Sequence, residues 1–561
     1  MIPPRSGPMD TGLGLLAGLM LLAAIALGFL PGQAGVPPLD RDEPRYTQAT
    51  KQMLETGDYV RIRFQDAPRH KKPVGIHWLQ AAAAKASGLG ADAPLWVYRI
   101  PSLLGALSAL LLSVWVARAF LPMPLALAVG AIFGATIILG VEARLAKTDA
   151  VLLATILLAQ GALARLWLSE RRPLGTAVLF WLALGAGILV KGPIAPMVCG
   201  LTIAALALAD RRRILSNLRF VIGIPIAAAV CLPWYLAIYA ATDGAFFVAA
   251  VGKDFLGKAA GGQEGHGAPP LTHIGLFLAV GWPLAPLAIA ALWRAVRMRS
   301  DAILFAAAWV VPAWIVFELT PTKLPHYTLP LLPGIALATV ASLAAATPPR
   351  ALKVLAGALV LAAPLGVLGA AVMAPFIFAQ IGAGDPSLVA DFPQVTVIVL
   401  AALAAAAGLA AAVAIWRGAR LVSPAVLAPV VAASVIAQAT IWGIALPATK
   451  PIWISPRLVA AAAEAAPCAS PRIISVGGFN EPSLVFLSGT NTALLTAEEA
   501  AEAVTLSGEG CAVIAARGEA VATVRAAALA KRVTLFEAGH VTGFNISKGD
   551  PIDLTLFQRA R

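Results

Sequence analysis

The stretch TGLGLLAGLMLLAAIALGFL, residues 11–30, contains twenty residues and no charged side chain. A helix of about twenty apolar residues is long enough to cross the hydrocarbon core of a bilayer. The run is too long for the apolar core of a signal peptide, and no clear small-residue cleavage site follows it. We therefore predict a retained first membrane span.

The rest of the chain has the same character as this first run. Of its 561 residues, 59% are hydrophobic and 13% are charged, whereas a soluble globular protein has about 25% charged residues. Apolar runs of similar length recur along the chain, and the ten-residue alternation of β-barrel strands is absent. The predicted fold class is a polytopic α-helical membrane protein.

Thirteen spans are predicted from the apolar runs. Their approximate residues are 11–30, 100–120, 123–141, 150–168, 174–190, 194–209, 218–239, 273–293, 302–318, 328–346, 352–378, 395–416 and 424–447. Five loops rich in Arg or Lys each follow an even-numbered span, at residues 169–173, 210–213, 293–301, 347–353 and 416–420. The positive-inside rule places these loops in the cytoplasm, which puts the C-terminal end of the chain outside.

The predicted outer loops carry polar side chains that membrane orientation alone does not require. They mix Asp, Glu, Lys, His and Tyr, and they comprise residues 31–99, 142–150, 191–193, 241–273 and 318–330. This concentration of mixed polar chemistry at one face predicts a site at the outer surface of the membrane. The formal charge of +13 fits either basic cytoplasmic loops or an anionic ligand such as a phosphate, and we predict no nucleic-acid partner.

The composition changes after about residue 455, where short apolar strands alternate with helices. Such alternation is typical of a small α/β domain. We therefore divide the chain into a transmembrane domain at residues 1–450, with juxtamembrane helices in its first outer loop, and an outer α/β domain at residues 451–561. Cys468 and Cys511 lie in that second domain, where an oxidising compartment would permit a disulfide. The sequence leaves open whether they pair.

The first outer loop begins with three acids, Asp40, Asp42 and Glu43. Carboxylates this close repel each other, which makes one of them a better proton acceptor unless a cation lies nearby. Such a group suits a general base that takes a proton from an attacking hydroxyl. The acids also precede a helical pattern that ends near Gly57, but a helix cap needs only one acid. We take Asp42 and Glu43 as catalytic candidates.

Several lysines stand at breaks in the outer part of the chain. Pro73 favours an extended backbone at Lys72, beside an apolar segment, so Lys72 fits a membrane anchor or a ligand of a lipid phosphate. Asp149 opens the fourth span, where an ionisable residue is costly unless it is paired or functional. Lys191 and Lys323 stand at further breaks. Together the lysines suggest an anion site, although each alone fits an anchor.

Seven motifs occur in a fixed order along the chain: DRDEPRY, HKKPVGIHWL, RIPSLLGAL, LAKTDA, LVKGP, GHGAPPLTH and TKLPHYTLPLLPGIAL. This ordered set, from about residue 11 to 345, resembles the bacterial polyprenyl-phosphate-dependent membrane glycosyltransferases related to aminoarabinose (lipid A) transferase and to protein O-mannosyltransferases. The resemblance implies a C-type glycosyltransferase (GT-C) fold and a sugar donor linked to undecaprenyl phosphate or a similar lipid. It also implies a bacterial inner-membrane location with the active site on the periplasmic side.

The resemblance also assigns roles to individual residues. Asp42 matches the essential first-loop acid of the family, Asp149 matches its second outer acid, and Lys72 matches the lysine of a Glu-Lys-Pro motif that binds the donor phosphate. We expect further phosphate contacts from Tyr327, Lys191, Lys323 and Arg45, and substrate contacts from Tyr46, His266 and His326. In the family, a histidine at the place of His266 joins a metal site with the glutamate of Glu-Lys-Pro. Here that glutamate is replaced by Lys71, so a divalent metal stays an open question.

The predicted function is transfer of a sugar from a polyprenyl-phosphate donor to an extracytoplasmic acceptor, with lipid A or another cell-envelope glycolipid favoured. Direct displacement would invert the anomeric centre. Two alternatives stay open: a protein O-glycosyltransferase of the same fold, and a transporter or flippase of lipid-linked sugars. A transporter usually places ionisable residues near the bilayer midplane and often has two related halves. Here the charges gather at the outer ends of the spans.

Overall fold

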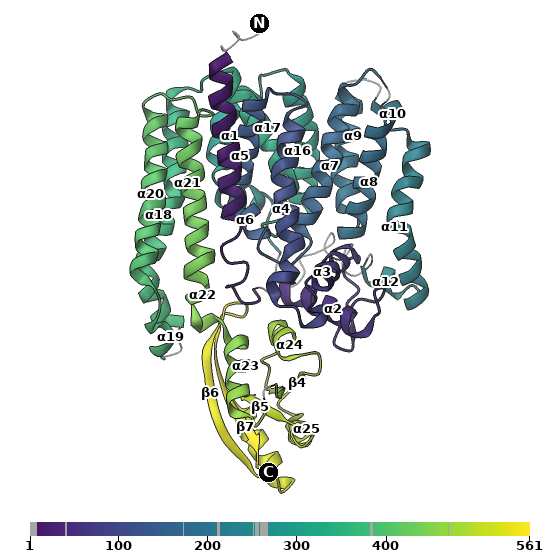
Figure 1. Cartoon of the computed structure of the whole chain (residues 1–561), viewed down its shortest axis with the longest axis vertical. Helices are drawn as coiled ribbons and strands as arrows, with labels where there is room; N and C mark the ends of the chain where they lie inside the picture. Colours follow the sequence, from purple (N-terminus) through teal and green to yellow (C-terminus); the bar gives the residue numbers. More distant parts are fainter. Residues whose placement is uncertain are drawn as a thin grey trace.

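The structure, a computed structural model, describes residues 8–39, 42–171, 173–209, 214–250, 252, 257, 267–381, 385–468 and 470–560. A bundle of long helices is joined at one end to a small sheet domain (Figure 1). The helix α1 (Pro8–Gly28) begins at the end of the bundle that lies far from the sheet domain.

Within the described residues, eight helices are long and apolar enough to cross a membrane. They are α4 (Leu95–Ala117), α7 (Asp149–Leu168), α8 (Leu174–Lys191), α11 (Phe220–Thr242), α16 (Asp301–Leu319), α18 (Arg350–Ile381), α20 (Gln394–Trp416) and the continuous helix Pro424–Ala448, which comprises α21 (Pro424–Thr440), η4 (Ile441–Ala445) and α22 (Leu446–Ala448). Each coincides with a predicted span to within a few residues.

One predicted span, residues 273–293, is not straight. The structure has two helices there, α14 (Thr272–Val280) and α15 (Leu284–Ala295), with an angle of 119° between them. Pro283 precedes α15 and has no backbone N–H to continue the hydrogen-bond ladder of α14. The predicted span is therefore a bent pair of helices; counted as one span, the pair is the ninth among the described residues.

Shorter apolar helices occupy the other predicted spans. These are the Gly14–Gly28 part of α1, α5 (Met123–Gly134), α9 (Ile194–Ala209) and the segment Leu329–Ala345, which comprises η3 (Leu329–Leu331) and α17 (Leu332–Ala345). The short helices α6 (Ile137–Glu142), α10 (Ile214–Asn217), α12 (Ala245–Phe247) and α19 (Ser387–Ala390) lie between or beside the long ones. The total of thirteen spans stays a prediction.

Close packing of α4 against α7 fixes where α7 begins. A Cβ atom on Gly105 of α4 would lie 2.8 Å from the carbonyl carbon of Ala150 in α7. Small residues allow two membrane helices to approach this closely. One turn earlier on α4, the Ser102 hydroxyl donates a hydrogen bond to the Lys147 carbonyl over 3.1 Å. These contacts hold the first turn of α7, and with it Asp149, against α4.

The predicted first outer loop, which keeps that name below, folds into a small layer at the lower end of the bundle in Figure 1. It contains α2 (Asp42–Thr56), a hairpin of β1 (Arg63–Phe64) and β2 (Ala67–Pro68), α3 (Gly75–Ala86) and η1 (Gly90–Asp92). The helix α2 ends one residue before Gly57, where the sequence pattern predicted its end. Asp42 and Glu43 occupy its first turn, where acids interact favourably with the helix dipole.

The C-terminal segment forms a five-stranded sheet with helices packed on it. Its elements are η5 (Lys450–Ile452), α23 (Ile454–Ala465), β3 (Arg472–Val476), α24 (Pro482–Ser488), β4 (Ala493–Leu495), α25 (Ala500–Leu506), β5 (Ala512–Arg517), α26 (Ala520–Ala530), β6 (Leu535–Asn545) and β7 (Asp550–Arg559). The strand order is β4-β3-β5-β7-β6. The strands β4, β3 and β5 are parallel, and the β6–β7 hairpin closes the sheet in antiparallel register.

This sheet domain docks on the first outer loop. The Phe486 ring of α24 packs edge-on against the Tyr98 ring of α4, with 5.7 Å between ring centroids. The Gln48 side chain of α2 donates to the Thr490 hydroxyl over 2.7 Å, and the Gln65 amide donates to the Thr490 and Thr492 carbonyls. The domain and the first outer loop therefore lie on the same side of the bundle.

Cys468 and Cys511 form a disulfide, which the sequence had left open. The bond closes a loop with a sequence separation of 43 residues, so it restricts the unfolded chain. We expect the double variant C468S/C511S to lower the free energy of unfolding of the C-terminal domain by about 2–4 kcal/mol. Proteolysis of that domain across a urea series measures the change. The variant C231S, which alters a free cysteine in α11, should leave the midpoint unchanged; an unchanged midpoint in the double variant would contradict the prediction.

Candidate active site

A cavity of about 450 Å³ opens where the first outer loop meets the ends of the bundle helices. Its charged and hydroxyl-bearing lining includes Asp42, Tyr46, Lys71, Lys72, Lys147, Asp149, Lys191, Tyr235, His326 and Tyr327. Its apolar lining includes Leu152, Ile194, Met197, Phe246, Phe247, Val316, Phe317 and Leu324. A cavity with a charged part and an apolar wall suits a ligand that has a charged head and a hydrocarbon chain.

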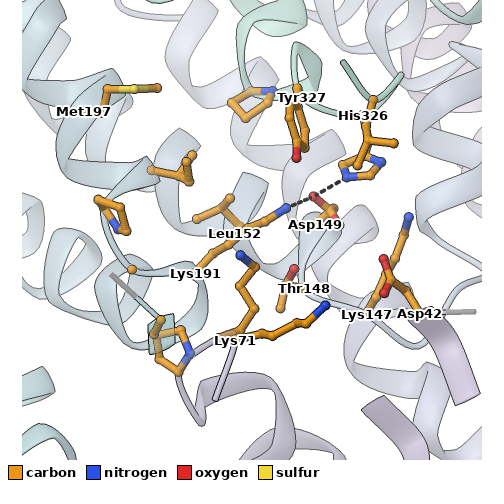
Figure 2. A pocket seen from close by; sticks show the side chains of 18 of the residues that line it. Asp42, Lys71, Lys147, Thr148, Asp149, Leu152, Lys191, Met197, His326 and Tyr327 are labelled. Atoms are coloured by element: carbon orange, nitrogen blue, oxygen red, sulfur yellow. Dashed lines mark hydrogen bonds and ion pairs between the residues drawn. The ribbon is translucent and has the colours of Figure 1, made fainter. Parts of the chain in front are cut away.

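Asp149 is the centre of the charged part of the cavity (Figure 2). Its Oδ1 atom accepts a hydrogen bond from the Lys191 Nζ atom over 2.5 Å, and the His326 Nε2 atom lies 3.8 Å from the same oxygen. The side chain of Asp149 is only 7% exposed. Asp149 also opens α7, where the helix dipole favours a negative charge. The carboxylate is therefore held in one position by groups from two other segments.

The pairing of Asp149 with Lys191 follows from the local fold. The helices α7, of 20 residues, and α8, of 18 residues, are joined by the short connection 169–173. Two antiparallel helices of nearly equal length bring the first residue of one beside the last residue of the other. Gly192 then ends α8 with φ of 61°, a conformation that glycine adopts without strain. Asp149 and Lys191 lie at nearly equal distances from the basic loop between the two helices, and this was a sequence signal for their pairing.

Asp42 is the more accessible of the two cavity acids. It begins α2, its side chain is 47% exposed, and the Arg69 Nη2 atom lies 3.9 Å from its Oδ1 atom. The guanidinium of Arg69 also lies 5.0 Å from the centre of the Tyr46 ring, one turn along α2. Burial raises the pKa of Tyr46 to about 12, so its hydroxyl stays protonated and can donate a hydrogen bond into the cavity.

The cations of the cavity outnumber its acids. Of the described lining residues, four are lysines and two are carboxylates. Figure 2 shows Lys71 on the side of Asp149 opposite Tyr327. The Nζ atom of Lys147 lies 3.1 Å from Glu142, a buried acid behind the cavity wall. The balance of charge favours an anionic ligand, and lysine is a common ligand of phosphate groups.

Three predicted site residues lie elsewhere. Glu43 does not line the cavity. Its buried carboxylate accepts hydrogen bonds from the Arg99 side chain and from backbone N–H groups, so Glu43 is not one of the two cavity acids. Lys323 does not line it either, since its Nζ atom donates to the Glu318 and Thr320 carbonyls at the end of α16. Arg45 is half-buried on α2 and is not part of the lining. The phosphate contacts predicted for Lys323 and Arg45 stay predictions.

One predicted site residue cannot be placed, and two further residues near the cavity were not predicted. His266 lies outside the described residues. Arg69 and Lys147 were not selected, yet Arg69 lies beside Asp42 and Lys147 lines the cavity. Arg69 belongs to the same basic run as Lys71 and Lys72, and Lys147 lies two residues before Asp149. Closeness in sequence to the predicted site residues could therefore have identified Arg69 and Lys147.

The described lining does not fit a divalent cation. Within the part of the chain that the structure describes, no group of three or more His, Cys, Asp and Glu side chains could hold a metal ion. Carboxylate oxygens and water are the usual ligands of Mg²⁺ and Ca²⁺, whereas the ammonium groups of Lys71 and Lys72 repel a cation. The mechanism proposed below therefore uses no metal.

The chain is similar in sequence to known membrane glycosyltransferases. Residues 71–236 match the family described as dolichyl-phosphate-mannose-protein mannosyltransferase. The chain is 27% identical over 338 residues to the undecaprenyl phosphate-alpha-4-amino-4-deoxy-L-arabinose arabinosyl transferase of Edwardsiella ictaluri. It is 28% identical over 326 residues to the enzyme of the same name in Pseudomonas aeruginosa. Each match covers 57% of this chain and 58% of the relative.

Solved structures extend the similarity over nearly the whole chain. The crystal structure of ArnT from Cupriavidus metallidurans bound to undecaprenyl phosphate matches with a TM-score of 0.75 at 15% identity, over 97% of this chain and 98% of that one. The fold is GT-C. The archaeal oligosaccharyltransferase AglB from Archaeoglobus fulgidus also matches, with a TM-score of 0.54 at 12% identity, over 99% of this chain and 75% of that one.

These similarities confirm the predicted resemblance to polyprenyl-phosphate-dependent membrane glycosyltransferases. They also confirm the predicted GT-C fold with a small sheet domain at the C-terminus. Within this GT-C fold, the match at residues 71–236 begins at Lys71 and includes Lys72, Lys147, Asp149 and Lys191.

Proposed function

We propose that this chain is an integral membrane glycosyltransferase that takes a sugar from an undecaprenyl-phosphate-linked donor. The acceptor is extracytoplasmic, with lipid A or another cell-envelope glycolipid favoured. One observation carries the proposal: a single cavity combines a lysine-rich part, two carboxylates and an apolar wall. The names of the arabinosyl transferase relatives, which join undecaprenyl phosphate with an amino sugar, support it.

The lysine-rich part binds the donor phosphate in this proposal. A polyprenyl phosphate gains negative charge as the bond between the sugar and the phosphate oxygen breaks. Lys72 and Lys191 line the cavity, and Tyr327 lies on the far side of Asp149 from Lys71. Fixed cations and a hydroxyl donor stabilise that developing charge without reorganisation of solvent. The apolar wall accepts the first part of the prenyl chain.

The two carboxylates act on the acceptor and the sugar. An acceptor oxygen forms a bond to the anomeric carbon while the bond to the phosphate oxygen breaks and that oxygen keeps the electron pair. If the acceptor is a hydroxyl, Asp42 takes its proton. If the acceptor is a phosphate, it is already ionised, and Asp42 orients a polar group of the sugar. Asp149, held by Lys191 and near His326, positions the sugar, and direct displacement inverts the anomeric centre.

The membrane arrangement belongs to the same proposal. Thirteen spans with Arg-rich and Lys-rich cytoplasmic loops put the cavity and residues 451–561 on the periplasmic side of a bacterial inner membrane. The disulfide between Cys468 and Cys511 supports an oxidising compartment for this domain. The domain division at residue 450 and the roles of Asp42, Asp149, Lys72, Lys191, Tyr46, Tyr327 and His326 also rest on this proposal.

The description of the matched family, a protein mannosyltransferase, favours one second candidate, a protein acceptor. The test uses the purified chain in nanodiscs with radiolabelled undecaprenyl-phosphate sugars and separate arms for lipid A, a cell-envelope extract and a Ser/Thr-rich peptide. We expect label in the lipid A or extract arm. Label in the peptide arm would replace the favoured acceptor. Movement of intact donor across proteoliposomes, with no labelled product, would overturn the transferase proposal.

Replacing Lys72 by Ala is expected to weaken donor binding by about 10- to 100-fold, because it removes a charge-assisted contact to the phosphate. Binding of undecaprenyl phosphate to the purified protein measures this change. Lys85→Ala is the matched control, since Lys85 is an exposed lysine of the same loop, 4.5 Å from the Tyr59 ring and outside the cavity. Unchanged affinity in Lys72→Ala would remove Lys72 from the phosphate site.

A further inference from the structure

Glu43 and Arg99 form a buried ion pair. We propose that this ion pair sets the position of Asp42 relative to Asp149, which makes Glu43 and Arg99 positioning residues for sugar transfer. The inference rests on the proposed function, because it assumes that these two acids act on the substrates. Neither Glu43 nor Arg99 lines the cavity, so neither touches a ligand there.

The ion pair has the geometry of a bidentate interaction. The Arg99 Nε atom donates to Glu43 Oε1 over 2.8 Å, and the Arg99 Nη2 atom donates to Glu43 Oε2 over 2.9 Å. Both side chains are fully buried. Two parallel hydrogen bonds between a planar guanidinium and a carboxylate fix orientation as well as distance.

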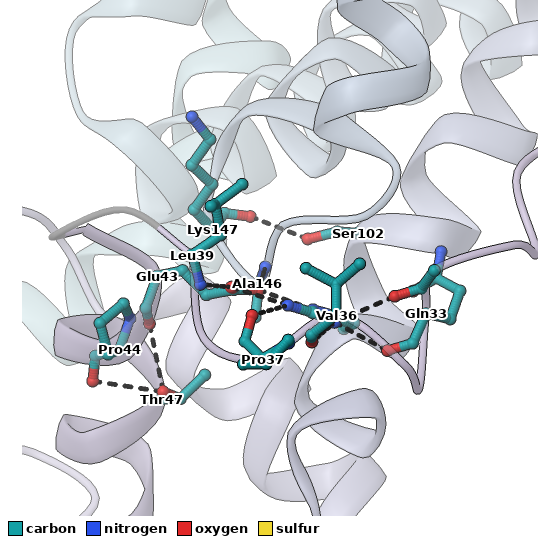
Figure 3. Close-up of polar contacts among 12 residues, drawn as sticks. Gln33, Val36, Pro37, Leu39, Glu43, Pro44, Thr47, Ser102, Ala146 and Lys147 are labelled. Carbon is teal, nitrogen blue, oxygen red and sulfur yellow. Dashed lines mark hydrogen bonds and ion pairs between the residues drawn. The ribbon is translucent and has the colours of Figure 1, made fainter. Parts of the chain in front are cut away.

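The same carboxylate also holds the segments that carry the two cavity acids. Glu43 directly follows Asp42 in the first turn of α2. Its Oε1 atom accepts a hydrogen bond from the backbone N–H of Ala146 over 2.9 Å, three residues before Asp149. Its Oε2 atom accepts another from the Leu39 N–H over 2.8 Å. Figure 3 shows these contacts meeting at one point between the segments.

Arg99 lies on α4 and links the contacts of Glu43 to that helix. Its Nη1 atom donates to the carbonyls of Gln33 and Val36, both over 2.8 Å, and its Nη2 atom donates to the Pro37 carbonyl over 3.2 Å. Residues 33–37 therefore wrap around the guanidinium. Together with the hydrogen bond from Ser102 to the Lys147 carbonyl, α4 holds both segments that lead to the cavity acids.

Stability alone does not account for a buried ion pair. Desolvation of the two charges offsets most of their attraction, and well-packed apolar residues often serve a fold equally well. A fully satisfied polar network instead specifies one arrangement of the groups around it. The groups around this ion pair include the backbone N–H groups of Leu39 and Ala146, which lead to Asp42 and Asp149. The network therefore fixes the distance between the two cavity acids.

The test compares E43Q and R99K in the full chain with the wild type. We expect each to lower kcat for transfer by about 10- to 100-fold. Undecaprenyl phosphate affinity should change by less than about threefold, because Lys72 and Lys191 stay in place. The control variants are E55Q, an exposed acid at the other end of α2, and R118K, an exposed arginine just past the end of α4. Both controls should retain full kcat.

A double-mutant cycle separates positioning from general support of the fold. If Glu43 acts through Asp42, E43Q should cost less than about threefold in a D42N background and its full factor in a K72A background. An equal loss in both backgrounds, or weakened undecaprenyl phosphate binding in E43Q alone, would show a merely structural role and overturn the inference.

The two proposals fail in different ways. Full kcat in E43Q and R99K, together with an inactive D42N, would overturn the inference and leave the proposed function standing. A D42N variant as active as the wild type would instead remove Asp42 from the proposed site.

Discussion

Replacing Asp42 by Asn is expected to lower the rate of sugar transfer by about a thousandfold, within the usual range for loss of a general base. Asparagine has the same size but cannot accept a proton from an acceptor hydroxyl. The Asp42 side chain is 47% exposed, so its replacement should have little effect on the fold. The measurement is kcat with labelled undecaprenyl-phosphate sugar in nanodiscs, with donor affinity and thermal unfolding measured on the same samples.

Asp66→Asn is the matched control for this variant, because Asp66 is an exposed acid in the same outer loop and does not line the cavity. It should transfer sugar at the wild-type rate. Wild-type kcat in Asp42→Asn would exclude Asp42 as base or positioning acid. A loss of donor affinity equal to the loss of kcat would place Asp42 at the phosphate instead.

The second large effect is expected from Asp149→Asn, which should lower kcat by about a hundredfold or more while donor affinity stays the same or rises. The substitution removes the negative charge 2.5 Å from the Lys191 ammonium. Lys191 then attracts the donor phosphate more strongly, but the sugar and His326 lose the carboxylate that positions them. Measurement of kcat tests the expected loss of transfer, and a separate measurement of undecaprenyl phosphate binding tests the expected unchanged or higher affinity.

Asp301→Asn is the control for the second prediction. Asp301 opens α16 as Asp149 opens α7, but it is exposed and lies outside the cavity lining. Its replacement should change neither quantity. Wild-type kcat in Asp149→Asn, with the variant folded, would contradict the role proposed for Asp149.

Asp42 and Glu43 show what a sequence pattern cannot separate. Both are acids at the same helix start, and both were predicted as catalytic. Successive residues of a helix point about 100° apart, so one faces the cavity while the other meets Arg99. The direction of each side chain depends on how α2 docks against α4, which the local pattern does not contain.

Lys191 and Lys323 show the same limit. Each stands at a break between apolar runs, and both were predicted to bind phosphate. Lys191 meets Asp149 because α7 and α8 are neighbouring antiparallel helices. Lys323 turns back to the carbonyl groups at the end of α16, where a lysine interacts favourably with the helix dipole. Only the packing of neighbouring helices distinguishes the two.

The sequence by itself determined the membrane class and the positions of most helices, because a bilayer leaves backbone polar groups no partner except those within a helix. It also indicated the GT-C resemblance through the order of its motifs, and it selected Asp42, Asp149, Lys72 and Lys191. The tertiary structure decided the bend between α14 and α15, and which of the selected charges share a cavity. Asp149 and His326 are far apart in the chain, and only helix packing brings them within 3.8 Å.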